Sequence, residues 1–162
     1  MRILVLSDSH GEVDAMVQAV KKVRPQMIFF LGDGWRDVET VQKKFPDTPF
    51  FQVPGNCDFQ LRGPMEQVVT VEGKKILLCH GHTYGVKQGL WEAYDAAEEQ
   101  ELDAFLFGHT HKPLVEMQGR TLFMNPGSIG MGWPPTYGLL TVEGGKIDGR
   151  IIPVLAKKRR FF

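Results

Sequence analysis

The chain has few cysteines, no excess of charge of either sign and no long apolar run. Its two cysteines, Cys57 and Cys79, are too few for a disulfide framework, which favours a reducing cytoplasm. Nineteen basic and nineteen acidic side chains cancel, so no overall field draws the protein to nucleic acid or to a membrane. The apolar stretch Ile3–Leu6 is too short for a signal peptide, and no run has the roughly 20 residues of a membrane-spanning helix. We therefore expect a cytoplasmic protein with no membrane partner and no stable nucleic-acid complex.

What remains is the composition of an ordinary globular protein. Hydrophobic residues make up 43% of the 162 residues and charged residues 23%. A chain of this length buries roughly 70% of its unfolded surface, so a single domain over residues 1–162 is expected. The basic stretch at residues 157–160 is either a solvated tail or a contact for an anion or a partner.

All five histidines stand in three short polar motifs that follow apolar runs, and two similar motifs carry aspartate. In chain order the five motifs are Asp8-Ser9-His10, Gly32-Asp33, Gly55-Asn56-Cys57-Asp58, His80-Gly81-His82 and Gly108-His109-Thr110-His111. Turn glycines with surface histidines would explain any one of these motifs, but not all five together. Imidazole and carboxylate groups gathered in this way suit a pair of divalent metal ions and need no thiolate.

Apolar runs rich in β-branched and aromatic residues alternate with segments of helical periodicity in the first part of the chain. The expected buried strands are Ile3–Leu6, Met27–Leu31, Phe50–Val53, Lys75–Cys79 and Ala104–Phe107. The expected helices are Glu12–Val23, a second over Val38–Phe45 and a third within Gln88–Gln100. This alternation predicts an α/β domain with parallel strand pairing in the first half.

The second half of the chain changes to hairpins with glycine in their turns. The predicted pairs are Val68–Val71 with Lys75–Cys79, Leu114–Met117 with Thr121–Met124, and Tyr137–Val142 with Lys146–Val154. The simplest assembly is two packed sheets, one mixed and one largely antiparallel, with helices outside, which makes a four-layer α/β/β/α sandwich. Every candidate ligand follows the carboxyl end of a strand, the edge at which open α/β sheets bind ligands. The five motifs can therefore converge on one site.

Taken in order, Asp-x-His, Gly-Asp, Gly-Asn-x-Asp, a strand-end histidine and Gly-His-x-His resemble the motifs of the calcineurin-like metallophosphoesterases. The short chain, the Cys79-His80-Gly81-His82 form of the fourth motif and Asn125-Pro126-Gly127-Ser128 are similar to the small bacterial and archaeal phosphodiesterase branch of that family. The resemblance runs by motif from Asp8 to Ser128 and implies the metallophosphoesterase fold. It also implies hydrolysis of small phosphodiesters with two divalent metal ions as cofactors.

The resemblance assigns a ligand role to seven residues. Asp8, His10 and His111 would hold one metal, Asn56, His80 and His109 would hold the other, and Asp33 would bridge them. A bridging carboxylate holds two cations roughly 3.5–4 Å apart, and a water shared by them becomes hydroxide near neutral pH and attacks phosphorus. Asp33 and Asn56 would thereby take part in catalysis. Nitrogen and oxygen ligands admit Mn²⁺, Fe²⁺, Co²⁺, Ni²⁺ or Zn²⁺, and the resemblance favours Mn²⁺.

One position departs from the family pattern. Many members have a histidine after Gly-Asn that is taken to protonate the leaving group, and this chain has Cys57 there. A thiol with an ordinary pKa near 8.5 is a poorer general acid than imidazole. We therefore expect esters with good leaving groups to be hydrolysed disproportionately well. His82 has no ligand role and is the candidate acid; alternatively it makes a hydrogen bond beside the ligands or contacts the substrate.

Two further features are open on the sequence alone. Asp37 either hydrogen-bonds a ligand or a neighbouring loop, or caps the helix near which it lies. The segment from Asn125 to Ser128 has the composition of a turn. Its position in the family suggests that this turn also lies beside the metals, through Ser128 or through backbone N–H groups.

The alternative function belongs to a different class. A eukaryotic retromer subunit resembles the same compact fold and serves chiefly as a protein-interaction scaffold, with a ligand set that departs from the pattern. In that case the hydrophobic surface near Trp133-Pro134-Pro135 would be the working part. This chain has all seven ligand positions, and charge clusters that destabilise the fold without metal have no use in a scaffold. The sequence therefore favours catalysis.

Two questions stay open beside that choice. Phosphomonoesterase or nuclease activity would use the same site, although the neutral net charge argues against long nucleic acids as substrates. Trp35, Phe59 and Trp133 either wall the site or form a contact between subunits, which leaves a homo-oligomer open.

Overall fold

The computed structural model of the chain describes residues 1–58 and 64–154; Phe59 and the basic stretch at 157–160 lie outside the described residues. Five strands form the first sheet, in the order β10-β9-β1-β2-β3. These strands are β1 (Arg2–Leu6), β2 (Met27–Phe30), β3 (Phe50–Gln52), β9 (Thr136–Glu143) and β10 (Lys146–Pro153). β1, β2 and β3 are parallel, as the strand–helix alternation predicts, and the β9–β10 hairpin adds two antiparallel strands beside β1.

The second sheet also has five strands, in the order β4-β5-β6-β8-β7. They are β4 (Glu66–Val71), β5 (Lys74–Cys79), β6 (Ala104–Leu106), β7 (Leu114–Gln118) and β8 (Thr121–Asn125). β4 and β7 pair antiparallel with their neighbours, whereas β5, β6 and β8 are parallel. The sheet is thus mixed rather than the largely antiparallel sheet that the hairpin pattern predicts. The difference arises because a helical crossover joins β5 to β6, and because β8 rather than β7 pairs with β6.

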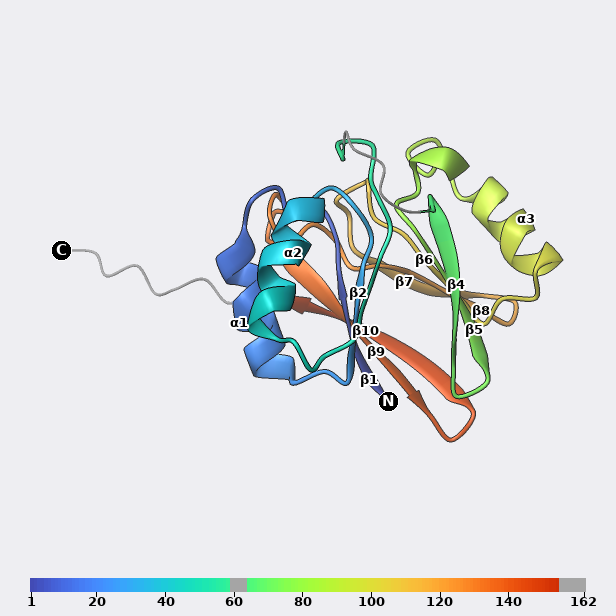
Figure 1. Cartoon of the computed structure of the whole chain (residues 1–162). Coiled ribbons are helices and arrows are strands. Elements are labelled where there is room, and N and C mark those ends of the chain that lie inside the picture. Colours follow the sequence, from blue (N-terminus) through green and yellow to red (C-terminus); the bar gives the residue numbers. More distant parts are fainter. Residues whose placement is uncertain (59–63, 155–162) are drawn as a thin grey trace.

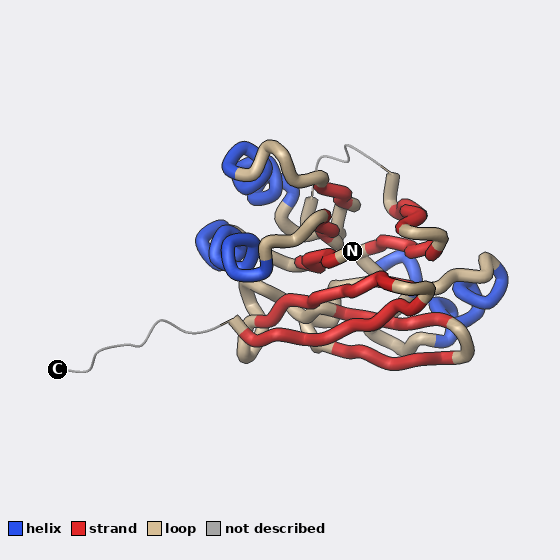
Figure 2. Tube along the Cα trace, turned by 90° about the horizontal axis from the view of Figure 1, so that it is seen from below, coloured by secondary structure: helices blue, strands red, loops and turns tan. Residues whose placement is uncertain are grey.

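In the part of the chain that the structure describes, three α-helices cover the outer faces of the two sheets. α1 (Val13–Val23) and α2 (Trp35–Lys44) lie on the first sheet and α3 (Trp91–Glu99) on the second, and a short 3₁₀ helix, η1, spans His82–Tyr84. An end-on view shows the strands lying between the two groups of helices (Figures 1 and 2). The four-layer α/β/β/α sandwich is therefore confirmed. None of the helices within residues 1–58 and 64–154 combines the length and apolar character that a membrane crossing requires.

Strand periodicity divides the core into three apolar layers. Along β1, Ile3 and Val5 face the second sheet, while Leu4 and Leu6 face α1 and α2. A third layer joins the outer face of the second sheet to α3 and includes Cys79, which is fully buried. The central strands are covered on both faces, so they are held rigidly and can position the loops at their carboxyl ends.

Candidate metal centre

The loops after β1, β2, β5 and β6 bring carboxylates and imidazoles from both sheets together. Asp8, His10 and His111 form one group and Asp8, Asp33 and His80 form a second, and in each group the three ligand atoms lie within 4.8 Å of one another. Both carboxylates are buried, with Asp8 0% exposed and Asp33 5% exposed. Buried carboxylates are stable only when they are hydrogen-bonded, paired or bound to a metal. The structure thus brings together five of the seven predicted ligands.

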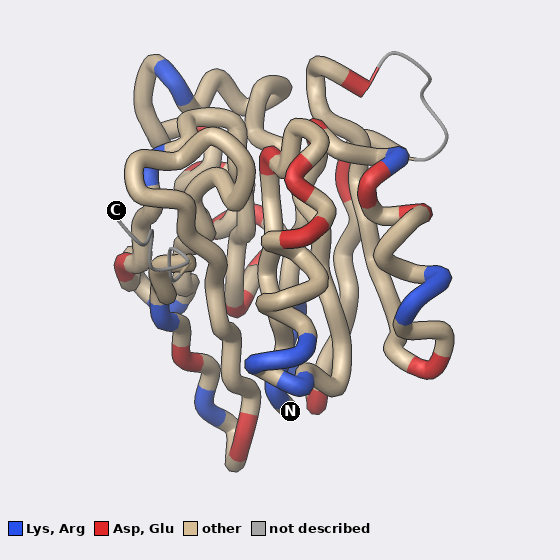
Figure 3. Tube along the Cα trace, turned by 90° about the vertical axis from the view of Figure 1, so that its left-hand side faces the viewer, with Lys and Arg blue, Asp and Glu red and all other residues tan. Residues whose placement is uncertain are grey.

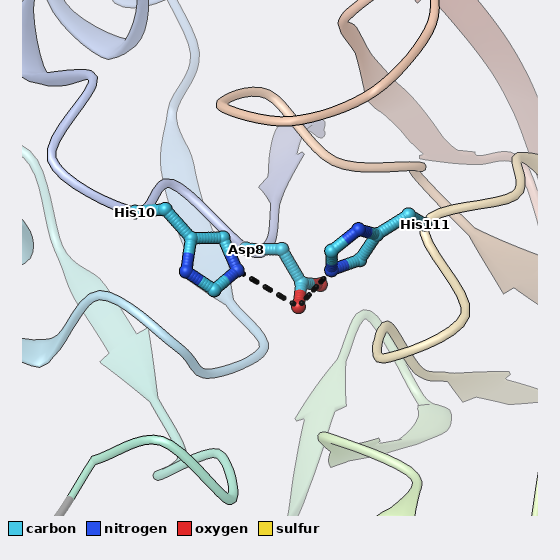
Figure 4. Close-up of side chains that lie close together, drawn as sticks. All are labelled: Asp8, His10 and His111. Atoms are coloured by element: carbon cyan, nitrogen blue, oxygen red, sulfur yellow. Dashed lines mark hydrogen bonds and ion pairs between the residues drawn. The ribbon is translucent and has the colours of Figure 1, made fainter.

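Asp8 lies between two histidine rings that come from distant parts of the chain (Figure 4). Its Oδ1 is 3.8 Å from Nε2 of His10 and 3.2 Å from Nε2 of His111. Its Oδ2 accepts hydrogen bonds from the Ser7 hydroxyl and from the backbone N–H of His109, at 3.1 Å in the latter case. One carboxylate oxygen is therefore fixed by protein donors, while the other faces the imidazoles.

His80 links the two sheets at the site. Its Nδ1 is 2.7 Å from the backbone oxygen of Leu31 at the end of β2, which makes Nδ1 the hydrogen-bond donor. Its Nε2 is buried and has no hydrogen-bond partner among the described residues, yet it is 3.3 Å from Oδ2 of Asp33 and 3.8 Å from Oδ1 of Asp8. A donor-anchored imidazole whose second nitrogen faces carboxylates is the usual arrangement of a metal-ligating histidine. The residues present therefore fit a divalent metal ion.

The electrostatics of this group favour added positive charge. Burial alone would raise the pKa of the Asp33 carboxyl, but the His80 ring and the N–H of Cys57 hold that pKa well below its usual range. Burial alone would likewise lower the pKa of His80, but Asp33 and Asp8 raise it above the ordinary value. The Asp33 carboxylate thus stays ionised and attracts a cation, which is what a metal site requires.

The backbone conformation of the ligand loops is unusual. Asp8, His10, Asp33, His109 and His111 all have φ between 43° and 69°, in the left-handed region. A side chain other than glycine in a sparsely populated backbone region costs on the order of 1–3 kcal/mol, and such residues cluster at functional sites. The surrounding packing must therefore hold these five residues in place, which is an independent sign that their positions serve a function.

Close approach of the loops requires glycine at two positions of the motifs. A Cβ at Gly55 would overlap the backbone and carboxylate of Asp33, and a Cβ at Gly108 would overlap Ser7 and the carboxylate of Asp8. Both glycines therefore let two loops pass within contact distance of each other at the site.

The other predicted site residues lie around this centre. Asn56 is exposed and follows β3, and the ring of His109 is 5.0 Å from that of His80, centroid to centroid. The ring of His82, in η1, lies 5.5 Å from His80 and 6.1 Å from His109. Burial lowers the pKa of His82, and positive charge on His80 lowers it further. His82 is thus a neighbour of the candidate ligands.

Asp58 organises the site in a way that the sequence did not indicate. Its carboxylate accepts hydrogen bonds of 2.7–3.1 Å from the backbone N–H groups of Asp33, Gly34, Trp35 and Gly55. It therefore binds the start of α2 and ties the Asp33 loop to the Asn56 loop, since free N–H groups at a helix N-terminus attract carboxylates. The only sequence signal was its place in the Gly-Asn-x-Asp motif.

We expect Asp58→Asn to lower the free energy of unfolding by about 2–3 kcal/mol, because hydrogen bonds to a charged acceptor contribute about 1.5–3 kcal/mol. Urea denaturation of the chelator-treated protein measures this change without a contribution from metal. Asp47→Asn is the matched control, since Asp47 is exposed. Equal stability of the two variants would show that the Asp58 carboxylate does not hold these loops.

Two features that the sequence left open are settled by their contacts. The carboxylate of Asp37 accepts hydrogen bonds from the Ser9 hydroxyl at 2.6 Å and the Gly11 N–H at 2.8 Å, so Asp37 braces the neighbouring His10 loop. The Ser128 hydroxyl donates to the backbone oxygen of Asp8 at 2.7 Å and accepts from the N–H of Met131. The turn therefore lies beside the ligand loops and supports the backbone of Asp8.

A cleft of about 520 Å³ opens beside the centre, between the start of α2 and the Asn56 loop. His10, Asp33, Trp35 and Cys57 are among the residues that line it. Trp35 therefore walls the site, as one of the two alternatives predicts. Trp133, in contrast, is 100% exposed.

Comparison with known proteins gives close matches along most of the chain. A family model described as the calcineurin-like phosphoesterase superfamily domain matches residues 1–145. The chain is 34% identical over 146 residues to the probable metallophosphoesterase YsnB of Bacillus subtilis, covering 88% of this chain and 85% of that protein. It is 27% identical over 184 residues to the phosphodiesterase YfcE of Escherichia coli, covering 96% and 92% of the two chains.

Solved structures show the same architecture. A predicted phosphoesterase from Streptococcus pneumoniae superposes with a TM-score of 0.81 at 25% identity, covering 94% of this chain and 88% of that one. Vps29 of Entamoeba histolytica, solved in complex with Zn²⁺, superposes with a TM-score of 0.72 at 19% identity, covering 96% and 100%, and shows the fold alone. Because the family model spans most of the chain, the protein belongs to the calcineurin-like phosphoesterase superfamily.

Proposed function

We propose that the protein is a metal-dependent phosphodiesterase that acts on small phosphodiesters. The observation that carries the proposal is the buried Nε2 of His80, which faces Asp8 and Asp33 and has no hydrogen-bond partner among the described residues. Superfamily membership supports the reaction class, and the phosphodiesterase name of the Escherichia coli relative supports diesters as substrates.

The proposed ligands are those that the sequence predicts. Asp8, His10 and His111 would hold one ion, Asn56, His80 and His109 would hold the second, and Asp33 would bridge them. The two compact groups share Asp8, so Asp33 as the bridging ligand stays a prediction. When bound, two divalent cations, Mn²⁺ by family resemblance, lower the pKa of a water and neutralise charge on the phosphoryl oxygens.

The residues beside the candidate metal centre contribute little proton transfer to the leaving group. The thiol of Cys57 is a poor proton donor because burial raises its pKa and the charge of Asp33 raises it further. The lowered pKa of His82 favours a neutral ring that contacts the substrate or a ligand over one that protonates the leaving group. Esters whose leaving groups need no proton are therefore the best substrates.

We expect His82→Ala to lower kcat/KM by the same factor, about tenfold or less, for bis(4-nitrophenyl) phosphate and for diphenyl phosphate. Loss of a contact slows both esters alike, whereas loss of a general acid slows the poorer leaving group by an additional factor of roughly 10²–10⁴. Initial rates on the two esters decide between the two roles. His82→Gln serves as the control, because it keeps a hydrogen-bonding group; a much larger loss on diphenyl phosphate would assign His82 as the acid.

The preference for diesters over monoesters has its own test. We expect kcat/KM for bis(4-nitrophenyl) phosphate to exceed that for 4-nitrophenyl phosphate by about tenfold or more, since the open cleft beside the centre accommodates a second ester group. Both esters release the same phenolate, so the rates compare directly. A faster monoester would make the protein a phosphomonoesterase with the same site.

The scaffold alternative is favoured by one observation, the fully exposed Trp133 near two prolines, together with the fold shared with Vps29. It does not account for the buried carboxylates and the unpartnered His80 nitrogen. Long nucleic acids are disfavoured as substrates. On the face of the molecule drawn in Figure 3, segments of Lys and Arg are interspersed with segments of Asp and Glu. They do not form the basic stripe that binding of long nucleic acids usually requires.

A further inference from the structure

A second cleft borders the candidate metal centre along the two loops from the second sheet. Its volume is about 490 Å³, within the range of small-molecule sites. Val86, Phe107 and Leu114 supply apolar surface, and Lys87 and Lys112 are both exposed. Neither lysine has a carboxylate within ion-pair distance among residues 1–58 and 64–154.

This second cleft is continuous with the loops that carry the histidines. Thr110, which lies between His109 and His111, is one of its lining residues. On the other wall, a Cβ at Gly81, between His80 and His82, would lie 2.8 Å from Cγ2 of Val86. A group in this cleft would therefore contact the same two turns that position the ligand histidines.

The two clefts differ in charge. Among the described residues, the cleft beside α2 is lined by four carboxylates, Asp33, Asp37, Glu39 and Asp58, and by one cationic side chain, Arg36. The second cleft, counted over the same part of the chain, is lined by two lysines and no carboxylate. An anionic substituent beyond the metal-bound phosphate is therefore favoured in the second cleft over the first, where the carboxylates of Asp37, Glu39 and Asp58 lie outside the proposed ligand set.

We propose that the second cleft is a substrate subsite that binds an additional phosphate on one arm of the phosphodiester, with Lys87 and Lys112 as the recognising cations. This inference rests on the proposed function and adds a substrate class to it, namely diesters that carry a second phosphate. The uncharged ester group then lies in the cleft walled by Trp35, and the difference in charge between the two clefts sets the orientation of the substrate.

The test uses two esters that differ only in the additional phosphate. Thymidine 5′-(4-nitrophenyl phosphate) and its 3′-phosphorylated form release the same nitrophenolate, so cleavage of the diester is measured alone. Two exposed lysine ammonium groups beside a bound phosphate together strengthen its binding roughly tenfold. We expect kcat/KM to favour the 3′-phosphorylated ester by about tenfold in the natural protein and this ratio to fall to near one in Lys87→Gln/Lys112→Gln.

Lys146→Gln is the control for the loss of a lysine charge away from the second cleft. Lys146 is exposed at the start of β10, and the β9–β10 turn lies at the end of the molecule opposite the ligand loops (Figure 1). This variant should retain the ratio. The proposed subsite is contradicted if kcat/KM is nearly equal for the two esters in the natural protein. It is also contradicted if the double variant keeps the preference for the 3′-phosphorylated ester.

Calorimetric binding provides a readout that does not depend on turnover. Thymidine 3′,5′-bisphosphate should bind the Mn²⁺-containing protein about tenfold more tightly than thymidine 5′-phosphate, and the double variant should lose this difference. If neither ester is hydrolysed, the proposed function fails, while binding still decides the subsite. Equal binding of the two nucleotides contradicts it.

Discussion

Replacing Asp33 with asparagine is expected to lower kcat/KM for bis(4-nitrophenyl) phosphate by roughly 10³-fold or more. The Asp33 carboxylate is almost fully buried, faces His80 and is held by the N–H of Cys57. An amide of the same size keeps only one oxygen and turns N–H donors toward a site built for cations. Loss of metal binding there removes several kcal/mol of transition-state stabilisation, at about 1.4 kcal/mol for each factor of ten.

Glu39→Gln is the matched control for this substitution. Glu39 lines the same cleft but is exposed and has no place in the ligand set. Its loss should change kcat/KM less than about threefold, as expected for an exposed carboxylate. Steady-state rates across a range of Mn²⁺ concentrations separate weakened metal binding from a direct catalytic effect. Full activity in Asp33→Asn at any metal concentration would show that the Asp33 carboxylate is not a metal ligand.

The second large effect is on stability. Removing divalent metal with a chelator is expected to lower the melting temperature by about 8–16 °C relative to protein with Mn²⁺ at a thousand times Kd. A ligand at that concentration stabilises the folded state by about 4 kcal/mol for one site, and each kcal/mol shifts Tm by about 2–4 °C in a domain of this size. The metal stabilises the folded state because the negative charges of Asp8 and Asp33 are buried close together. Bound cations neutralise these charges.

A pair of histidine variants makes this measurement specific. His111→Ala removes a proposed ligand and should reduce the Tm shift on adding Mn²⁺ by half or more, because the Asp8 group loses one of its three members. His82→Ala removes a nearby histidine outside the ligand set and should keep the shift. Differential scanning calorimetry with and without chelator measures the metal-induced Tm shift of each variant. Identical metal-induced shifts in all three proteins would mean that Mn²⁺ binds elsewhere.

Much of the candidate site could be predicted from the sequence because the proposed ligands follow the ends of apolar runs. The spacing of Ile3–Leu6 and Met27–Leu31 indicates buried parallel strands, and parallel strands end at the same edge of a sheet. It follows that Asp8 and Asp33 come together, as they do. The convergence of His80 from the other sheet depended on the ordered set of motifs, since no periodicity predicts which edges of two sheets face each other.

The features of the fold and the site that the sequence did not predict depend on long-range contacts, which leave no local pattern in the sequence. Asp58 binds N–H groups some 25 residues earlier in the chain, and a lone aspartate after a glycine turn predicts no such partner. The left-handed backbone of the proposed ligand residues is likewise imposed by packing, since Asp8 and His10 have no intrinsic preference for that conformation. The parallel pairing of β6 with β8 was missed because a hairpin pattern predicts the partner within the hairpin but not which of its strands joins the sheet.

The most direct test of the account is a titration of metal-stripped protein with Mn²⁺, in which bound metal and hydrolysis of bis(4-nitrophenyl) phosphate are measured on the same samples. Two ions bound per chain, with activity that rises as the site fills and is absent from Asp33→Asn, is the predicted result. Protein that binds Mn²⁺ but hydrolyses no phosphodiester with any divalent ion would contradict the account and favour the interaction scaffold.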